Sequence, residues 1–272
     1  DMYLGAEDTD EGTDNDAVMA GYSFQIDLNT SFTGEDSLDI AIDAGVSGVG
    51  IDEFDGNGNG DSLKVDGLSY TFPLGDKTTV IAGIDTDGSA LFTTACVYGG
   101  PGNMLDDCAN VNAGITGGGA TVGAAYDFGT GLTAAFGAQT TESAVFTDES
   151  LDAYALNAAY TADSYGVSVT YGVVETSSTN EDTYTAFNAY YLPEGSNLPS
   201  LSVGYEIGDI GGAAATVDEK TSFMVGLSWD EVGPGSAGIA LGHSSTVEGS
   251  DEEYQYEACL LYTSPSPRDC DR

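Results

Sequence analysis

Residues 18–29 read VMAGYSFQIDLN, a stretch in which apolar and polar side chains alternate. The apolar set is Val18, Ala20, Tyr22, Phe24, Ile26 and Leu28, and the polar set is Ser23, Gln25, Asp27 and Asn29. A period of two residues is typical of a β-strand with two different faces. In a soluble sandwich the apolar face points into a packed core, whereas in a membrane barrel it points to lipid and the polar face lines a wet interior.

The same alternation recurs along the chain, and it predicts an all-β protein of about 13 strands. The predicted strands are residues 18–32, 37–46, 62–72, 78–85, 119–128, 132–139, 152–161, 165–173, 183–191, 200–207, 221–229, 237–243 and 253–258. The short connections are 33–36, 73–77, 129–131, 162–164, 192–199 and 230–236, and the mostly longer ones are 47–61, 86–118, 140–151, 174–182, 208–220 and 244–252. Connections that are alternately short and long are typical of a transmembrane antiparallel up-and-down β-barrel, with periplasmic turns and external loops.

The charge of the chain narrows the range of partners. Its 272 residues include 45 acidic and 5 basic ones, which gives a formal net charge of -40. A protein this acidic repels nucleic acid, so nucleic acid is excluded as a partner. Acidic residues gather in residues 6–16, 52–61, 142–152 and 248–253, between the predicted strands. No apolar run reaches the roughly eighteen residues of a spanning helix, so a membrane role would depend on strands of about 9 to 11 residues.

Aromatic residues lie beside the predicted short turns. They are Tyr70, Phe72, Phe128, Tyr160, Tyr165, Tyr190, Tyr191 and Trp229. Amphipathic rings favour the boundary between lipid and water, and we expect these to form an aromatic girdle in contact with outer-membrane lipid. The alternative is that aromatic residues favour strands anywhere.

The longest connection, residues 86–118, is the best candidate for a loop that folds into the barrel and narrows the pore. It contains Cys96 and Cys108, and a disulfide between them would staple the loop, as is common outside the cytoplasm. The alternative is a pair of reduced or unpaired surface cysteines. Two thiols without a nearby histidine make a poor zinc site. The candidate constriction acids are Asp85, Asp87, Asp106 and Asp107.

A second connection resembles a calcium-binding loop. Its candidate ligands are Asp55, Asn57, Asn59, Asp61 and Asp66, with Gly60 at the turn position. The spacing fits oxygen ligands for Ca²⁺, although the last position carries Asp instead of Glu and no helices flank the loop. The alternative is an ordinary acidic surface loop. Apart from this divalent cation, we expect no cofactor.

The sequence gives little support for an enzyme. Its single histidine, His243, lies in a strand pattern, and no Ser/His/Asp set can be singled out among the many Ser and Asp residues. We therefore expect no catalytic residues.

Six fragments resemble the porins of marine cyanobacteria, a family similar to the carbohydrate-selective OprB-like porins and often labelled iron-uptake porin. The fragments are SFTGEDSLDIAI (31–42), SYTFPLGDK (69–77), LFTTACVYGGPGN (91–103), NAAYTADSYGVSVTYG (157–172), DTYTAFNAYY (182–191) and LPSLSVGYEIGDIGG (198–212). The resemblance covers residues 1–258. It implies a barrel of about sixteen strands, a homotrimer and passage of small solutes. The resemblance also implies that peptidoglycan is bound only through an N-terminal domain, which we expect to be missing here.

Both ends of the chain differ from this family pattern. Residues 259–269 read CLLYTSPSPRD, which resembles a translated sequencing-library adapter, and the alternation stops at Ala258. We therefore expect a partial porin barrel over 1–258 and a non-native tail over 259–272. Bacterial barrels have an even number of strands, so thirteen strands indicate truncation at both ends. Residues 2–5 would then end a preceding strand.

These observations predict an outer-membrane porin for passive diffusion of small hydrophilic solutes and ions, including carbohydrates and iron. Acidic loops and an acidic lumen would favour cations. Two alternatives stay open at this point. The acidic loops could capture iron or calcium as a binding and uptake protein, or the chain could be a soluble secreted acidic β-protein without a pore.

Overall fold

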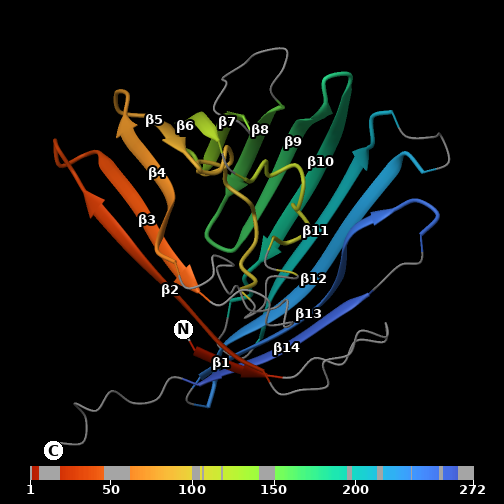
Figure 1. Cartoon of the computed structure of the whole chain (residues 1–272). Coiled ribbons are helices and arrows are strands. Elements are labelled where there is room, and N and C mark those ends of the chain that lie inside the picture. Colours follow the sequence, from red (N-terminus) through yellow and green to blue (C-terminus); the bar gives the residue numbers. More distant parts are fainter. Residues whose placement is uncertain are drawn as a thin grey trace, which may run out of the picture. The chain divides into compact units, whose positions relative to one another are not determined.

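One antiparallel sheet contains all the strands of the described protein. The structure, a computed structural model, describes residues 2–5, 19–45, 62–99, 105, 107–117, 119–140, 151–194, 198–212, 217–233, 235–250 and 254–262. Within these ranges fourteen strands lie in the order β1 to β14, so that each strand pairs with its neighbours in the chain (Figure 1). Their bounds are β1 Met2–Gly5, β2 Met19–Thr30, β3 Ser37–Gly45, β4 Lys64–Pro73, β5 Thr78–Ile84, β6 Ala120–Asp127, β7 Leu132–Thr140, β8 Asp152–Thr161, β9 Tyr165–Ser177, β10 Asn180–Tyr191, β11 Ser200–Asp209, β12 Glu219–Val232, β13 Gly235–Val247 and β14 Gln255–Tyr262.

The predicted fold class is confirmed, and each of the thirteen predicted strands is present. The fourteenth is β1, which pairs with β2 from Met2↔Tyr22 to Gly5↔Met19. The prediction that the last strand ends at Ala258 is wrong, because β14 continues to Tyr262, which pairs with Gly235. Apolar Leu260 and Leu261 continue the ladder beyond Ala258. No helix in the described part of the chain is long and apolar enough to cross a membrane.

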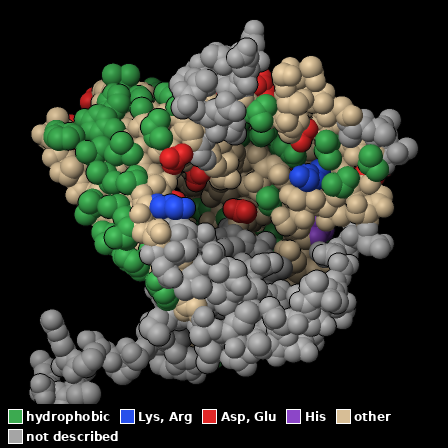
Figure 2. Space-filling model, viewed as in Figure 1, with side chains coloured by type: hydrophobic (Ala, Val, Ile, Leu, Met, Phe, Trp, Pro, Cys, Tyr) green, Lys and Arg blue, Asp and Glu red, His purple; other side chains and the backbone are tan. Residues whose placement is uncertain are grey.

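The sheet carries its apolar side chains on the exposed face. On β2, Tyr22, Phe24, Ile26 and Leu28 are exposed, Leu28 by 50%. On β11 the exposed side chains are Leu201, Val203, Tyr205 and Ile207, while Ser202, Gly204, Glu206 and Gly208 between them are buried. Figure 2 shows hydrophobic side chains gathered over the outer side of β2–β4. We call the two sides the apolar face and the polar face; this distribution is the reverse of a soluble core.

The connection between β2 and β3 shows how a short turn is held. Asp36 is buried, and its Oδ1 accepts hydrogen bonds from the Ser31 hydroxyl at 2.6 Å and from the Thr33 N–H and hydroxyl at 2.7 Å each. The Tyr70 hydroxyl donates to its Oδ2 at 2.6 Å. These donors, above all Ser31, followed by Tyr70 and Thr33, hold the pKa of the Asp36 carboxyl well below its ordinary value.

This turn makes stability depend on pH. Because the folded pKa of Asp36 is lowered, its contribution to stability is complete above the unfolded pKa of about 3.9 and is lost as the pH falls through the folded value. Between pH 6 and pH 3 we expect the urea midpoint of the Asp36→Asn variant to fall less than that of the parent protein. Asp163→Asn, at an exposed turn position, is the control and should keep the parent's dependence. Equal pH dependence in the parent and Asp36→Asn would contradict the assignment.

The chain folds into two compact units. The first comprises residues 1–92, 114–156 and 172–181, and the second comprises 93–113, 157–171 and 182–272.

Candidate pore-lining site

The described residues of the connection between β5 and β6, which are 85–99, 105, 107–117 and 119, pack against the polar face of the sheet. Its described residues fall into both units, with residues 85–92 and 114–119 in the first and residues 93–113 in the second. We call residues 93–98 the crossing segment and residues 107–113 the return segment. The sequence predicted that this connection folds into the barrel and narrows the pore. The structure places its described residues against the polar face of the sheet, and the narrowing of a pore stays a prediction.

Glycines on the polar face make room for this connection. A Cβ added at Gly137 would lie 1.8 Å from the Gly88 carbonyl oxygen, and one at Gly204 would lie 1.8 Å from the Cys108 carbonyl oxygen. A Cβ at Gly226 would lie 2.6 Å from the ring of Tyr98. The close approach of loop and sheet therefore depends on the absence of side chains at these positions.

Polar side chains on β8, β9 and β11 hold the crossing segment. Asn157 on β8 accepts a hydrogen bond from the Thr93 N–H at 3.0 Å, and Ser168 on β9 accepts one from the Ala95 N–H at 2.9 Å. Ser202 on β11 accepts from the N–H groups of Val97 and Tyr98, each at 3.0 Å. These bonds satisfy backbone donors that burial would otherwise leave unpaired.

Tyr98 ends the crossing segment with its hydroxyl donating to Glu257 on β14 at 2.8 Å. Burial and, second, this hydrogen bond raise the pKa of Tyr98 well above its ordinary value. Its phenol therefore stays neutral. Tyr98 also belongs to a small apolar cluster between the connection and strands β12 and β13, whose other members are Leu105, Cys108, Ala109, Met224 and Ala240.

Cys96 and Cys108 are joined by a disulfide in the structure, with their Cα atoms 6.4 Å apart. The bond links the crossing segment to the return segment. Cys108 is buried, and its carbonyl oxygen accepts a hydrogen bond from the Asn188 amide at 2.6 Å. The ring closed by the bond would stabilise the fold by roughly 3 kcal/mol in the chain-entropy model.

We predict that neither Cys96 nor Cys108 reacts with a maleimide in non-reduced, denatured protein. Reaction at both thiols would contradict the bond. Cys96→Ser should change the conductance, but only modestly, because Ser168, Ser202 and Asn188 still hold both arms of the loop. Single-channel recording with and without a reductant measures this effect, and Cys96→Ser should be insensitive to the reductant.

Five carboxylates line one pocket of about 380 Å³ on the polar face of the first unit. They are Asp27 on β2, Asp39 on β3, Asp66 on β4, and Asp85 and Asp87 at the start of the long connection. The Asp85 carboxylate accepts a hydrogen bond from the Gly119 N–H at 3.0 Å, and the Asp87 carboxylate accepts one from the Gly117 N–H at 3.1 Å. These hydrogen bonds fix the positions of both carboxylates. Both contribute negative charge to the lining of the pocket.

The pocket contains two of the predicted constriction acids, Asp85 and Asp87, together with acids from the strands, and their place at a constriction stays a prediction. Asp27 and Asp39 were not among the candidates, although Asp27 belongs to the polar set of residues 18–29 and its alternation signals a lining position. Of the other two candidates, Asp107 is exposed on the return segment, and Asp106 lies outside the described residues. Four of the calcium candidates, Asp55, Asn57, Asn59 and Asp61, also lie outside them, whereas Asp66 is exposed on β4. Calcium binding stays a prediction.

The aromatic residues beside the short turns occupy the apolar face, with one exception. Tyr70 and Phe72 stack with their ring centroids 5.5 Å apart, and Tyr160 and Tyr165 lie 6.0 Å apart. Phe128 and Tyr191 are exposed, and Trp229 is partly exposed. The girdle prediction is wrong for Tyr190, whose ring covers Gly166 on the polar face. Consecutive strand residues point to opposite faces, so Tyr190 and Tyr191 cannot belong to the same girdle.

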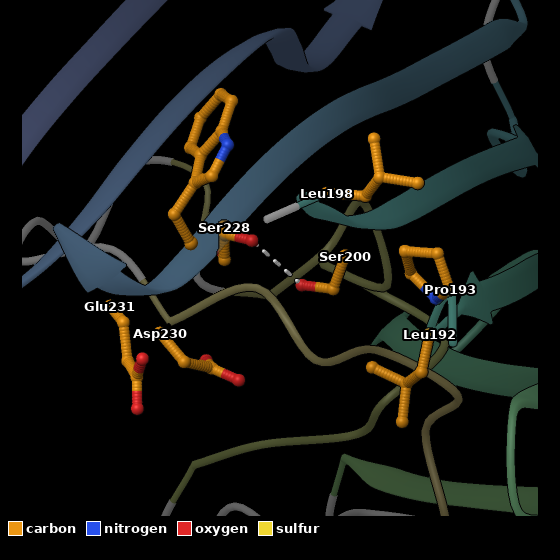
Figure 3. A pocket seen from close by; sticks show the side chains of 8 residues that line it. Leu192, Pro193, Leu198, Ser200, Ser228, Asp230 and Glu231 are labelled. Carbon is orange, nitrogen blue, oxygen red and sulfur yellow. Dashed lines mark hydrogen bonds between the residues drawn. The ribbon is translucent and has the colours of Figure 1, made fainter. Parts of the chain in front are cut away.

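A second hollow, of about 350 Å³, lies beside the short connections after β10 and β12. Leu192, Pro193 and Leu198 border one side and Asp230 and Glu231 the other, and Ser200 donates to the Ser228 carbonyl oxygen at 3.3 Å (Figure 3). His243 lies elsewhere on β13, packed edge-on against Phe223 and within hydrogen-bond distance, 3.0 Å, of the Thr246 hydroxyl. His243, within β13, is thus packed against neighbouring side chains and lines neither pocket.

No family model and no curated protein matches the sequence. Solved structures match over nearly the whole chain. A mutant of the Rh. blastica porin aligns with a TM-score of 0.56 at 10% identity, covering 96% of this chain and 86% of that one. A triple mutant of the Rhodopseudomonas blastica porin gives 0.55 at 10% identity, with 97% and 87% covered. A structure described as showing asymmetric conductivity of engineered proteins gives 0.55 at 10% identity, with 96% and 86% covered. The chain therefore has the antiparallel β-barrel fold of these porins.

Proposed function

We propose that the full-length protein is an outer-membrane porin through which small hydrophilic solutes and ions diffuse passively. The observation that carries this proposal is the reversed distribution of side chains, with apolar residues exposed on one face and a long connection packed on the polar face. An exposed apolar face of this extent suits lipid rather than water. The porin fold of the structural neighbours supports the same conclusion.

We further propose that the pore favours cations and also admits neutral carbohydrates, with iron among the transported ions. The five aspartates in one pocket support cation preference, because a carboxylate-lined wall attracts cations and repels anions. We also propose that the protein is a homotrimer in the outer membrane.

Reconstitution in planar bilayers tests the proposed function. The full-length protein in detergent should migrate as a heat-modifiable band and should produce discrete conductance steps above the lipid background. Absence of conductance from folded, heat-modifiable protein would overturn the porin proposal. Protein that stays monodisperse without detergent would instead favour a soluble β-protein, because an exposed apolar face should cause aggregation in water.

A further inference from the structure

A buried carboxylate attaches the return segment to the sheet, in addition to the Asn188 amide that donates to the Cys108 carbonyl oxygen. Glu206 lies on the polar face of β11 and is only 1% exposed. Its Oε2 accepts hydrogen bonds from the backbone N–H groups of Asn112 and Ala113, each at 2.8 Å. Its Oε1 accepts a hydrogen bond from the Asn112 side-chain amide at 2.6 Å. All three of these donors belong to the loop.

The residues around Glu206 leave space for the return segment. Its neighbours across the sheet are Ala186 on β10 and Ser222 on β12, and both are fully buried. Along β11 the polar face carries Gly204 before Glu206 and Gly208 after it. Glu206 is therefore a long side chain among small ones, which lets the loop come down onto the sheet and meet the carboxylate.

An irregularity in β13 adds a second anchor for Asn112. The pairing of β12 with β13 shifts register between Thr221 and Phe223, and Ser245 opposite this point has a positive φ of 52°. A bulge re-aims a side chain out of the regular ladder. The Ser245 hydroxyl accepts a hydrogen bond from the Asn112 amide at 3.0 Å. Asn112 thereby bridges β11 and β13.

Burial and the number of donors distinguish Glu206 from the other anchors. The crossing segment is held by the neutral acceptors Asn157, Ser168 and Ser202 and, at its end, by Glu257, which accepts one hydrogen bond from the Tyr98 hydroxyl. The Glu206 carboxylate is buried and accepts three hydrogen bonds from the return segment. Hydrogen bonds to a charged acceptor are about twice as strong as neutral ones. A buried carboxylate is tolerated only when its partners stay in place, so it strongly disfavours displacement of the loop.

We propose that Glu206, acting with Asn112, is the positioning residue that fixes the return segment and thereby sets the open width of the pore. This inference rests on the proposed function, because it assigns Glu206 a task within the same pore. Glu206 acts through the loop and need not meet the solute.

The test exchanges the donor and acceptor of this pair. In Glu206→Gln the introduced amide nitrogen faces the side-chain amide nitrogen of Asn112. Both groups are hydrogen-bond donors, so the hydrogen bond between the two side chains is lost. We expect transitions to a second conductance level to become roughly tenfold more frequent, the effect of losing a hydrogen bond to a charged group. Backbone hydrogen exchange in residues 107–113 should accelerate by a similar factor. Asn112→Asp alone, which places two carboxylates together, should behave in the same way.

The double variant Glu206→Gln/Asn112→Asp should restore both readouts toward the parent values, since the amide now donates to the introduced carboxylate. A loss of stability unrelated to this pair would not be rescued in this way. Glu219→Gln is the matched control, because it removes the same charge from an exposed position on β12 and should change neither readout.

The two proposals fail in different ways. If the double variant stays as impaired as Glu206→Gln, or if Glu206→Gln behaves like Glu219→Gln, the positioning role is overturned. If the parent protein does not conduct, the porin proposal fails, and hydrogen exchange still tests the anchor. Should Glu206→Gln not yield a heat-modifiable band, Ser245→Ala takes its place. It removes only one acceptor from Asn112 and should accelerate exchange to a smaller extent, whereas unchanged exchange would overturn the role.

Discussion

A Gly204→Ala variant should lose the native placement of the return segment. The added Cβ would lie 1.8 Å from the Cys108 carbonyl oxygen and 2.9 Å from the Asn188 amide nitrogen. The first contact is between the added Cβ and a backbone oxygen of the loop, so no side-chain rotation relieves it. Overpacking typically lowers stability by about 1–3 kcal/mol, and we expect at least the upper end of this range. Urea titration of the heat-modifiable band measures the loss.

Gly99→Ala is the matched control for this variant. Gly99 belongs to the same connection, and a Cβ there would meet no atom within 4 Å. We expect its stability and conductance to equal those of the parent protein. Variants at position 204 that still fold should conduct more and with greater current noise, because the displaced loop no longer narrows the pore. Parent-like stability and conductance of Gly204→Ala would mean that the return segment does not pack on β11.

Removing the three carboxylates that β2, β3 and β4 contribute to the aspartate-lined pocket should sharply reduce cation selectivity. The triple variant Asp27→Asn, Asp39→Asn, Asp66→Asn takes three charges from the acidic pocket and leaves Asp85 and Asp87 in place. In dilute salt we expect its reversal potential across a salt gradient to shift strongly toward zero. The control removes the same number of charges at exposed positions in short connections, with Asp76→Asn, Asp163→Asn and Glu194→Gln, and it should keep the parent selectivity.

Salt concentration provides a second check on which acids matter. The screening length is about 8 Å at physiological ionic strength and about 3 Å at 1 M, so acids far from the ion path lose their influence first. We therefore expect the parent protein to be clearly cation-selective in dilute salt, and less so, but still measurably, near 0.5 M. Neutral sugars should pass at either concentration. An anion-selective channel at low salt would contradict the proposal that these aspartates line the path of the ions.

The strands and their faces could be predicted from the sequence because the signal is local. Alternation over residues 18–29 is enough to place Tyr22 on one side and Asp27 on the other. Failures came where the alternation was set aside or where pairing between strands decides the outcome. Alternation along β10 places Tyr190 and Tyr191 on opposite faces of the sheet. The prediction instead grouped both residues because they lie beside the same short turn. The extension of β14 depends on its pairing with β13, which is not visible in residues 259–262 alone.

The anchors of the long connection could not be predicted, because they join residues far apart in the chain. Nothing near Asn112 indicates that its partner is Glu206, 94 residues later. One signal was nevertheless present. Within residues 204–208, GYEIG, a glutamate stands between two glycines on one strand face, and a charged side chain flanked by glycines indicates backbone approaching from outside the strand. The identity of that backbone required the structure.

The path of the crossing segment also bears on the order of assembly. Thr93 is held by Asn157, 64 residues later, and Tyr98 by Glu257, 159 residues later. During synthesis the connection emerges before every strand that anchors it. Contacts of such long sequence separation form slowly, because the intervening chain must first be ordered. We therefore expect the channel to pass through a wide, unconstricted intermediate, in which the sheet is assembled before its own loop closes down onto it.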